Sequence, residues 1–331
     1  MRALGYERAG DAAEAQRLVA AQPDAMFLAG GTNLVDLMKL GVARPALLID
    51  LAAIGLDEID HRADGSVVIG AMARNARVAG DPGIRERFPV LAQALLAGAS
   101  GQLRSVASTA GNLLQRTRCV YFQDVAKPCN KREPGSGCAA IEGAHRDLAL
   151  LGTSEHCVAS HPSDMAVAMV ALDGVVHLTR AGGDADQMLV EELYREPGTT
   201  PERETNLTAG DLITSVQLPA VPVGARMAYR KVRDRRSYAF ALVSVAALTV
   251  TDEDGRIRDL RLGFGGVASR PWRARTAEAQ LTGTRPTADD ITAAVAAEFS
   301  SARPLPDNAF KAELMADTVA AVLGDLLGDE A

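Results

Sequence analysis

Hydrophobic and polar positions along the chain predict short strands that alternate with helices. Residues 11–21 mix alanine with polar residues at helical spacing, and the apolar run at 26–29 predicts a strand that enters a glycine turn. Residues 32–41 return to helical spacing and end at a glycine, and the apolar run 45–51 then predicts a buried strand. The first part of the chain therefore has the pattern of a strand–loop–helix–strand unit.

A second layer of strands and helices is predicted over residues 55–220. A strand in GSVVIGAMARNARV precedes an apolar helix around residues 88–99, and RSVASTAGNLLQ indicates a second glycine turn that opens a helix. The apolar runs HRDLALLG, HCVASH and GVVHLTR have the length of strands, with a helix in PSDMAVAMVALDG between the last two, and DLITSVQLP predicts a further strand. This order indicates an α/β layer.

The last third of the chain has a different pattern. Residues 220–226 form a plausible boundary, and FALVSVAALTVTDEDGRIRDLRLGFGGV alternates like two antiparallel strands joined by an Asp-Gly turn. PWRARTAEAQLTG and the alanine-rich stretches 288–299 and 309–327 predict helices. We expect an α+β domain here.

Composition and charge exclude several classes of protein. The chain has 331 residues, of which 47% are hydrophobic and 4% aromatic, and its net charge of −7 argues against a general nucleic-acid-binding surface. No run approaches the ~18 apolar residues of a membrane span, and the N-terminus lacks the features of an export signal. The compartment stays open between cytoplasm and periplasm, the latter by export together with a partner that carries a signal.

Two glycine turns are candidates for binding a phosphate. AGGTNL (29–34) and STAGN (108–112) each lie where a helix begins, so backbone amides converge there. Each alone is equally well explained as a plain turn, but two such loops suit the two phosphates of a pyrophosphate. Neither has the Walker or the Rossmann pattern. Asp164, at another predicted helix start, either bonds a ribose hydroxyl or complements the helix dipole.

Three of the four cysteines lie in the segment 116–138, which also holds five basic and two acidic residues. No close pair typical of a structural zinc site is present among Cys119, Cys129, Cys138 and Cys157. Positive charge lowers the pKa of a thiol and offsets the charge of a thiolate-bound cluster, which favours an iron–sulfur cluster. Zinc, disulfides or free thiols stay open as alternatives.

Several stretches together resemble the FAD-binding medium subunit of the molybdenum hydroxylases, the family of xanthine dehydrogenase and carbon monoxide dehydrogenase. They are FLAGGTNLVDLMKLG, ASTAGNLLQRTRC, HPSDMAVAMVALDG, DLITSVQLP and YRKVRDRRSYAFALVSVAA. The insert RCVYFQDVAKPCNKREPGSGCAAIEG with LGTSEHC is similar to the subset related to the periplasmic aldehyde oxidoreductase, whose flavin subunit also carries a [4Fe–4S] cluster.

The resemblance implies an α+β protein with a PCMH-type, non-Rossmann FAD-binding fold. Its parts would be two α/β FAD subdomains at 1–54 and 55–220, the second with a cluster loop at 116–138, and a C-terminal α+β domain at 224–327 like that of CO dehydrogenase flavoproteins. The implied FAD-binding residues are Phe27, Leu28, Ala29, Gly30, Gly31, Thr32, Asn33, Leu34, Ser108, Thr109, Gly111, Asn112, Asp164, Ile213 and Lys231, and the cluster ligands are Cys119, Cys129, Cys138 and Cys157.

The resemblance also implies a function without a substrate site on this chain. A molybdenum-cofactor large subunit would oxidise an aldehyde, a small subunit with two [2Fe–2S] clusters would relay electrons, and FAD on this chain would pass them to an external acceptor. No catalytic residue is expected here. An autonomous flavin oxidoreductase and a zinc-stapled nucleotide-binding module are the alternatives.

Overall fold

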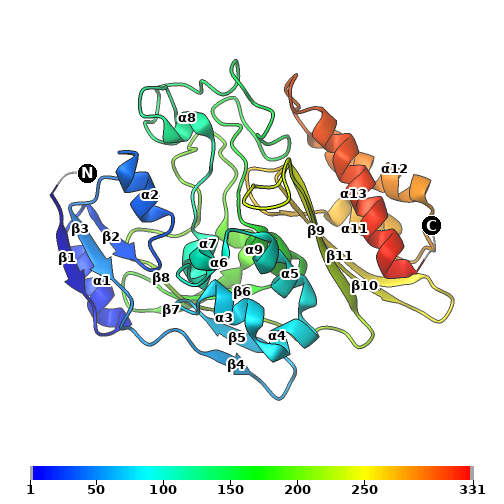
Figure 1. Ribbon diagram of the computed structural model, residues 1–331, viewed down its shortest axis with the longest axis horizontal. Coiled ribbons are helices and arrows are strands. Elements are labelled where there is room, and N and C mark those ends of the chain that lie inside the picture. The colour runs from blue at the N-terminus through cyan, green and yellow to red at the C-terminus, as the bar shows by residue number, and fades with distance from the viewer. Residues whose placement is uncertain (1–2, 329–331) are drawn as a thin grey trace.

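The computed structural model describes residues 3–328 and contains three sheets in the order of the chain (Figure 1). The small first sheet lies at one end of the molecule and the C-terminal helix α13 (Phe310–Leu327) at the other. The segment around α8 (Val120–Gln123) lies at the top of this view, between the first and third sheets. The predicted mixture of helices and sheets is confirmed.

The first sheet is parallel, with the strand order β1-β3-β2. It comprises β1 (Gly5–Arg8), β2 (Ala25–Leu28) and β3 (Leu47–Asp50), accompanied by α1 (Ala12–Ala21) and α2 (Leu34–Lys39). The predicted unit is therefore confirmed. Strand β1 was not predicted, because all four of its residues are exposed and its sequence GYER has no apolar alternation.

The second sheet has five antiparallel strands in the order β4-β5-β8-β6-β7. They are β4 (Ile59–His61), β5 (Val67–Gly70), β6 (Val175–Thr179), β7 (Ala185–Leu189) and β8 (Leu212–Leu218). The helices of this part are α3 (Asn75–Gly80), α4 (Pro82–Arg87), α5 (Pro89–Ala97), α6 (Gly101–Arg104), α7 (Thr109–Leu113), α8, α9 (Asp164–Ala171) and α10 (Val190–Leu193).

Two of the predicted strands in this part are wrong. HRDLALLG and HCVASH contribute only isolated bridges, Leu151 to Ala268 and Ser154 to Cys157. Their apolar residues are nevertheless buried, since Leu148 belongs to the same hydrophobic cluster as Cys157 and Val158. These runs are apolar because they line the core beneath the cysteine-bearing loops, and such runs cannot be distinguished from buried strands by hydrophobicity alone.

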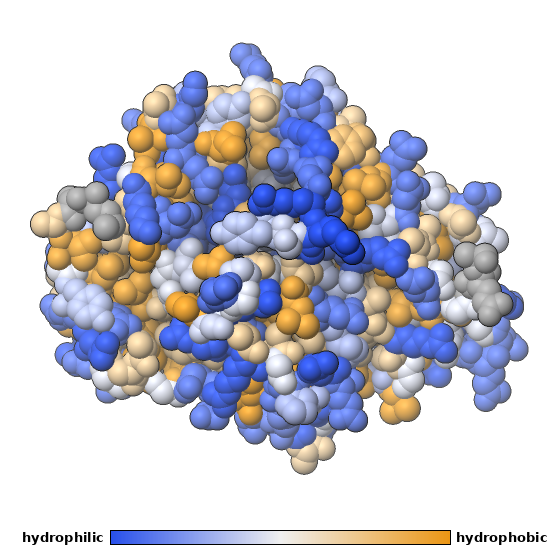
Figure 2. Space-filling model, viewed as in Figure 1, coloured by the Kyte–Doolittle hydropathy of each residue, from blue (hydrophilic) through white to orange (hydrophobic). Residues whose placement is uncertain are grey.

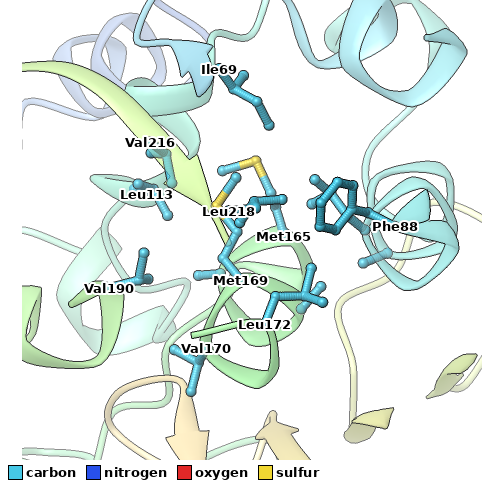
Figure 3. Close-up of a cluster of buried hydrophobic side chains, with 14 of the residues drawn as sticks. Ile69, Phe88, Leu113, Met165, Met169, Val170, Leu172, Val190, Val216 and Leu218 are labelled. Atoms are coloured by element: carbon cyan, nitrogen blue, oxygen red, sulfur yellow. The ribbon is translucent and has the colours of Figure 1, made fainter. Parts of the chain in front are cut away.

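Helix α9 lies at the centre of the largest hydrophobic cluster, and all eight of its residues are buried. Figure 3 shows Met165 and Met169 of this helix among side chains from the second sheet and from neighbouring helices, including Ile69, Phe88 and Val216. Burial of such side chains contributes about 1.5–3 kcal/mol each. The helix is therefore a fixed support for the residue at its start, Asp164.

The third sheet is antiparallel, with the order β12-β11-β10-β9. Its strands are β9 (Arg226–Val232), β10 (Val243–Thr251), β11 (Ile257–Gly265) and β12 (Trp272–Arg273), followed by α11 (Arg275–Leu281), α12 (Ala288–Glu298), the 3₁₀ turn Phe299–Ser301 and α13. The predicted Asp-Gly turn and all three helices are confirmed. Helices α5 and α9 contact strands of this sheet, so the second and third parts are packed together.

The surface in Figure 2 mixes hydrophilic and hydrophobic residues across the visible face. Among residues 3–328, none of the helices is both long enough and apolar enough to cross a membrane.

Candidate functional site

The first glycine loop connects β2 to α2 and leaves backbone amides open. Gly31 has φ +71°, a left-handed conformation that favours glycine, and its carbonyl accepts a hydrogen bond from the amide of Val35 at 2.9 Å. Within residues 3–328, no acceptor pairs with the backbone amides of residues 30–34. Free amides at the start of a helix are suited to bind an anion.

In the second glycine loop, most backbone amides already have hydrogen-bond partners within the protein. Ser108 caps helix α7, because its hydroxyl accepts the amide of Gly111 at 3.2 Å. The amides of Thr109 and Ala110 donate to the carbonyls of Ala73 and Ala71 at 3.0 and 2.9 Å. The expectation that both loops offer open amides is therefore wrong for this loop. Its amides are already used in hydrogen bonds that connect helix α7 to the residues after β5.

The two glycine loops are in contact, although the sequence separates them widely. A Cβ atom on Gly30 would lie 2.3 Å from the carbonyl oxygen of Val106 and 3.0 Å from the Cα of Ala107. A Cβ atom on Gly111 would lie 3.9 Å from the Cβ of Ala29. The close approach at Gly30 requires a residue without a side chain, and it brings the second loop beside the open amides of the first.

Asn33 joins the first loop to the start of the cysteine-bearing segment. Its Oδ1 accepts a hydrogen bond from the backbone amide of Arg116 at 2.9 Å, and its Nδ2 is buried without a hydrogen-bond partner. Asn33 stands at the start of α2, but its backbone is helical and its side chain makes no cap bond. A buried donor without a partner costs about 1–3 kcal/mol, so this amide fits a site that receives an acceptor such as a phosphate oxygen.

The other predicted residues of these loops differ in exposure. Thr32 is exposed, whereas Ser108 and Thr109 are buried. Asn112 accepts a hydrogen bond from the hydroxyl of Ser163 at 2.7 Å, which connects α7 to the start of α9. Residues of intermediate exposure are Phe27, Leu28, Ala29, Gly30, Gly31, Asn33, Leu34, Gly111 and Asn112.

Asp164 is held by two residues of β9. Tyr229 donates its hydroxyl hydrogen to Oδ1 at 2.5 Å, and the ammonium of Lys231 lies 2.8 Å from Oδ2. The side chains of Lys231 and Asp164 are only 3% and 9% exposed. Burial, together with the nearby carboxylate, keeps the pKa of Tyr229 well above 10, so its hydroxyl remains a donor. The structure thus brings the predicted residues Asp164 and Lys231 together.

Ile213 lies behind the second glycine loop, on a strand that contacts helix α7. It is on β8, and its side chain is 2% exposed within the hydrophobic cluster that contains Leu113 of α7.

The four cysteines line one pocket. Cys119, Cys129, Cys138 and Cys157 surround it together with Tyr121, Phe122, Pro128, Asn130, Lys131, Ala140, His156 and Ala159, and all four thiols are free. Cys129 and Cys138 face each other in an isolated antiparallel bridge, and Ser154 pairs with Cys157 in another. Sequence reasoning therefore identified a set of residues that the fold gathers from three separate loops.

Most basic residues of the segment 116–138 stabilise the loops by hydrogen bonds or ion pairs. Arg132 donates to the carbonyls of Tyr121 and Phe122 at 2.9 and 2.8 Å. Arg118 donates to the carbonyl of Arg116 at 2.7 Å. Lys131 lines the pocket and forms an ion pair with Glu204 at 3.0 Å. Glu204 was not predicted, since no local motif in its sequence indicates this contact.

The expectation that nearby positive charge lowers the pKa of the thiols is wrong for two cysteines. Burial raises the pKa of Cys119 to about 11 and also raises the pKa of Cys157, although the charge of Lys131 opposes the shift at Cys157. Desolvation by burial therefore outweighs the charge of the nearby basic residues at these two thiols. A metal that binds here must displace the thiol protons.

In residues 3–328, no set of three or more His, Cys, Asp or Glu side chains is arranged to hold one ion. In a [4Fe–4S] cluster each thiolate binds its own iron, so the four sulfurs stand further apart than the ligands of one zinc ion.

The glycine loops and the cysteine pocket share helix α2. The helix begins at the first glycine loop, and its Leu37 belongs to the same hydrophobic cluster as Cys119, Cys129 and Cys157. The bond from Arg116 to Asn33 adds a second connection. A ligand at the loops and a metal cluster in the pocket would therefore be neighbours.

Comparison with known proteins assigns a family to this arrangement. Residues 2–221 match the family "FAD binding domain in molybdopterin dehydrogenase", and residues 209–326 match the "CO dehydrogenase flavoprotein C-terminal domain". The chain is an FAD-binding medium subunit of the molybdenum hydroxylase family. It is 50% identical over 326 residues to the aldehyde oxidoreductase FAD-binding subunit PaoB of Escherichia coli, with 98% of each chain covered.

More distant relatives of this medium subunit support the same family. The carbon monoxide dehydrogenase medium chain of Afipia carboxidovorans is 25% identical, with 88% of this chain and 83% of that one covered. The solved structure of carbon monoxide dehydrogenase from Hydrogenophaga pseudoflava matches with a TM-score of 0.76 and 23% identity, covering 100% of this chain and 99% of that one. The structural match establishes the fold that was expected from the resemblance.

Proposed function

We propose that this medium subunit carries FAD and a [4Fe–4S] cluster and transfers electrons within a molybdenum-dependent aldehyde oxidoreductase. The observation that carries the proposal is the shared helix α2, which has the open amides of residues 30–34 at its start and Leu37 against the cysteine pocket. The likeness to an aldehyde oxidoreductase subunit supports aldehydes as the substrate class, with N-heterocycles second.

The FAD pyrophosphate would lie between the two glycine loops. The open amides of residues 30–34 and the unpaired Nδ2 of Asn33 would donate to its oxygens, and the loop 108–112 would form the opposite wall. Asp164 would bind near the adenosine end, positioned by Tyr229 and Lys231. Ile213 and Lys231 stay in the proposal as weaker contacts.

The cluster would be held by Cys119, Cys129, Cys138 and Cys157, because these four free thiols line one buried pocket. Cys157 lies outside the insert, next to Val158 in the hydrophobic cluster, and so would tie the cluster to the body of the subunit. Bound FAD accepts electrons singly and releases them in pairs, which suits an exit point for electrons.

The proposed assembly contains a molybdenum-cofactor large subunit and a small subunit with two [2Fe–2S] clusters. The medium subunit would hold no substrate-oxidising residue, and the domain bounds 1–54, 55–220 and 224–327 stay part of the proposal. Electrons would enter from the partner clusters and leave from FAD to an external acceptor.

Purification of the chain with its partner subunits tests the proposal. We expect about one FAD and four iron and four sulfide per medium subunit beyond the content of the partners, and flavin reduction by an aldehyde only when the molybdenum subunit is present. Stoichiometric zinc without flavin would support the nucleotide-binding alternative. Rapid reduction of the isolated chain by aldehyde would support an autonomous flavoenzyme.

A further inference from the structure

Glu204 lies far along the chain from the cysteine-bearing insert but contacts two of its basic residues. Its carboxylate forms ion pairs with Arg116 and, at 3.0 Å, with Lys131. The two cations hold the pKa of the half-buried Glu204 below its usual value, so the carboxylate is charged at neutral pH. This carboxylate therefore places a fixed negative charge beside the cysteine pocket.

Lys131 lies between that carboxylate and the pocket. Its side chain is 9% exposed, it lines the pocket with the four cysteines, and its ammonium also donates to the carbonyl of Pro201 at 3.0 Å. Two acceptors thus fix the ammonium in one place. A charge held at a defined position in a poorly solvated site acts more strongly than one that moves in water.

Arg116 extends this contact toward the flavin side. Its guanidinium stacks 4.7 Å from the ring centroid of Phe122, which also lines the pocket, and its backbone amide donates to Asn33. The three residues Arg116, Lys131 and Glu204, here named the 204 ion network, therefore contact the cysteine pocket through Lys131 and the first glycine loop through the backbone of Arg116.

The other basic groups of the insert have different partners. The guanidinium of Arg132 is directed to backbone carbonyls, and that of Arg118 lies over the ring of Phe240 at 5.3 Å. In the 204 ion network, by contrast, a lysine that lines the pocket forms an ion pair with a carboxylate.

We propose that Glu204 and Lys131 are positioning residues that set the reduction potential of the cluster in the cysteine pocket. The inference rests on the proposed function. Reduction adds one electron, and hence one negative charge, to the cluster. Lys131 stabilises the added charge and raises the potential, while Glu204 opposes it and lowers the potential.

Charge-removing variants in the purified complex test this inference. For Glu204→Gln we expect the ratio of reduced to oxidised cluster at a fixed applied potential to rise threefold or more. For Lys131→Gln we expect that ratio to fall by a similar factor, and Lys131→Arg should restore it most of the way. The cluster potential is followed by redox titration with electron paramagnetic resonance, alongside iron content and thermal stability.

Asp211→Asn is the matched control. Asp211 is a buried carboxylate paired with Arg180 at 2.7 Å, but neither residue lines the cysteine pocket. We expect this variant to lose stability without a change in potential. If the network had a purely structural role, Glu204→Gln and Lys131→Gln would change the cluster potential in the same direction or would not change it. Either result overturns the inference.

Failure of the proposed function can be distinguished from failure of this inference. A wild-type complex that lacks the extra four irons would contradict the proposed function before any variant is compared. Where Glu204→Gln does not fold, the pair Lys131→Gln and Lys131→Arg decides the outcome. Equal potentials in those two variants, each with full iron content, also overturn the inference.

Discussion

The backbone amide of Arg116 donates to Oδ1 of Asn33 at 2.9 Å, so one side chain joins the glycine loop before α2 to the residue that opens the cysteine-bearing segment. The same Asn33 keeps its Nδ2 buried and unpaired. One end of this amide is thus used for structure, and the other is left for a ligand. Nδ2 and Oδ1 are attached to the same carbon, so a ligand that bonds to Nδ2 would fix the group that also holds the amide of Arg116.

Replacement of Gly30 by alanine tests the close approach of the two glycine loops. A Cβ at this position would lie 2.3 Å from the carbonyl oxygen of Val106, which is backbone and cannot turn aside. The loops must then separate, so we expect Gly30→Ala to weaken FAD binding at least tenfold and to destabilise the fold by about 1–3 kcal/mol. Flavin content after gel filtration and urea denaturation measure the two effects.

Gly101→Ala is the control for that variant. Gly101 is the first residue of α6, and a Cβ there would meet nothing within 4 Å. We expect full flavin content and unchanged stability for this substitution. Full flavin content in Gly30→Ala as well would show that the loop contact does not support the cofactor.

Exchange of Asn33 for aspartate separates its two roles. The carboxylate of Asn33→Asp still accepts the amide of Arg116, but it presents an oxygen where Nδ2 was a donor. Repulsion of a phosphate should lower FAD affinity tenfold or more with little loss of folding stability. Titration of flavin-free protein with FAD measures this affinity. Unchanged affinity would show that no phosphate oxygen of FAD binds at Nδ2 of Asn33.

Sequence reasoning recovered the parts of the site that are local in the chain. Glycine loops and helix starts are short patterns whose residues are neighbours, and the loop at 29–34 was predicted from them. The four cysteines that line the pocket were singled out by their rarity in the chain and by the family resemblance. The two glycine loops, predicted to hold one ligand from two sides, are in contact in the structure. The helix α9 and the β10–β11 hairpin were likewise predicted from their apolar residues, most of which are buried.

Contacts between distant segments were not predictable in this way. Glu204 has no motif around it, and Tyr229, although it begins one of the family stretches, was given no role. Their contacts come from the fold, which sets Glu204 against Lys131 and Tyr229 against Asp164. The raised pKa of Cys119 was also missed, since the count of nearby arginines says nothing about where each guanidinium points. Charge in the sequence predicts a local field only when burial and direction are known.

The buried pair Lys231 and Asp164 predicts a stability effect between the second and third parts of the chain. Lys231→Met leaves the carboxylate of Asp164 with only the hydroxyl of Tyr229, so we expect a loss of about 3 kcal/mol. The double variant with Asp164→Asn should be less destabilised than the single one, because no unpaired charge remains. Denaturation of all three variants gives the coupling, and additive effects would contradict a direct pair.

His161 predicts that stability is lost in mild acid. Burial beside Tyr194 lowers the pKa of His161 from 6.5 to about 4, so the folded protein holds this ring neutral where the unfolded chain protonates it. The unfolded state then binds more protons, and stability is complete above pH 6.5 and falls as the pH drops toward 4, by about 3 kcal/mol. The variant His161→Gln should show a shallower slope by up to one proton in urea denaturation between pH 4 and 7. Equal slopes would mean that the ring is not buried in its neutral form.

Cys129→Ser tests the cluster through one of its proposed ligands. Cys129 lies in the turn that pairs with Cys138, and serine keeps the shape of the turn while it removes the thiolate. We expect the complex to lose most of the iron assigned to this subunit and its visible absorption, and to lose thermal stability, because a group bound only by the folded state stabilises that state. Ser136→Ala is the matched control, since it removes the hydrogen bond from the amide of Cys129 to the Ser136 hydroxyl, at 3.0 Å, and leaves every thiol in place. Iron retained in Cys129→Ser at the level of this control would exclude Cys129 as a ligand.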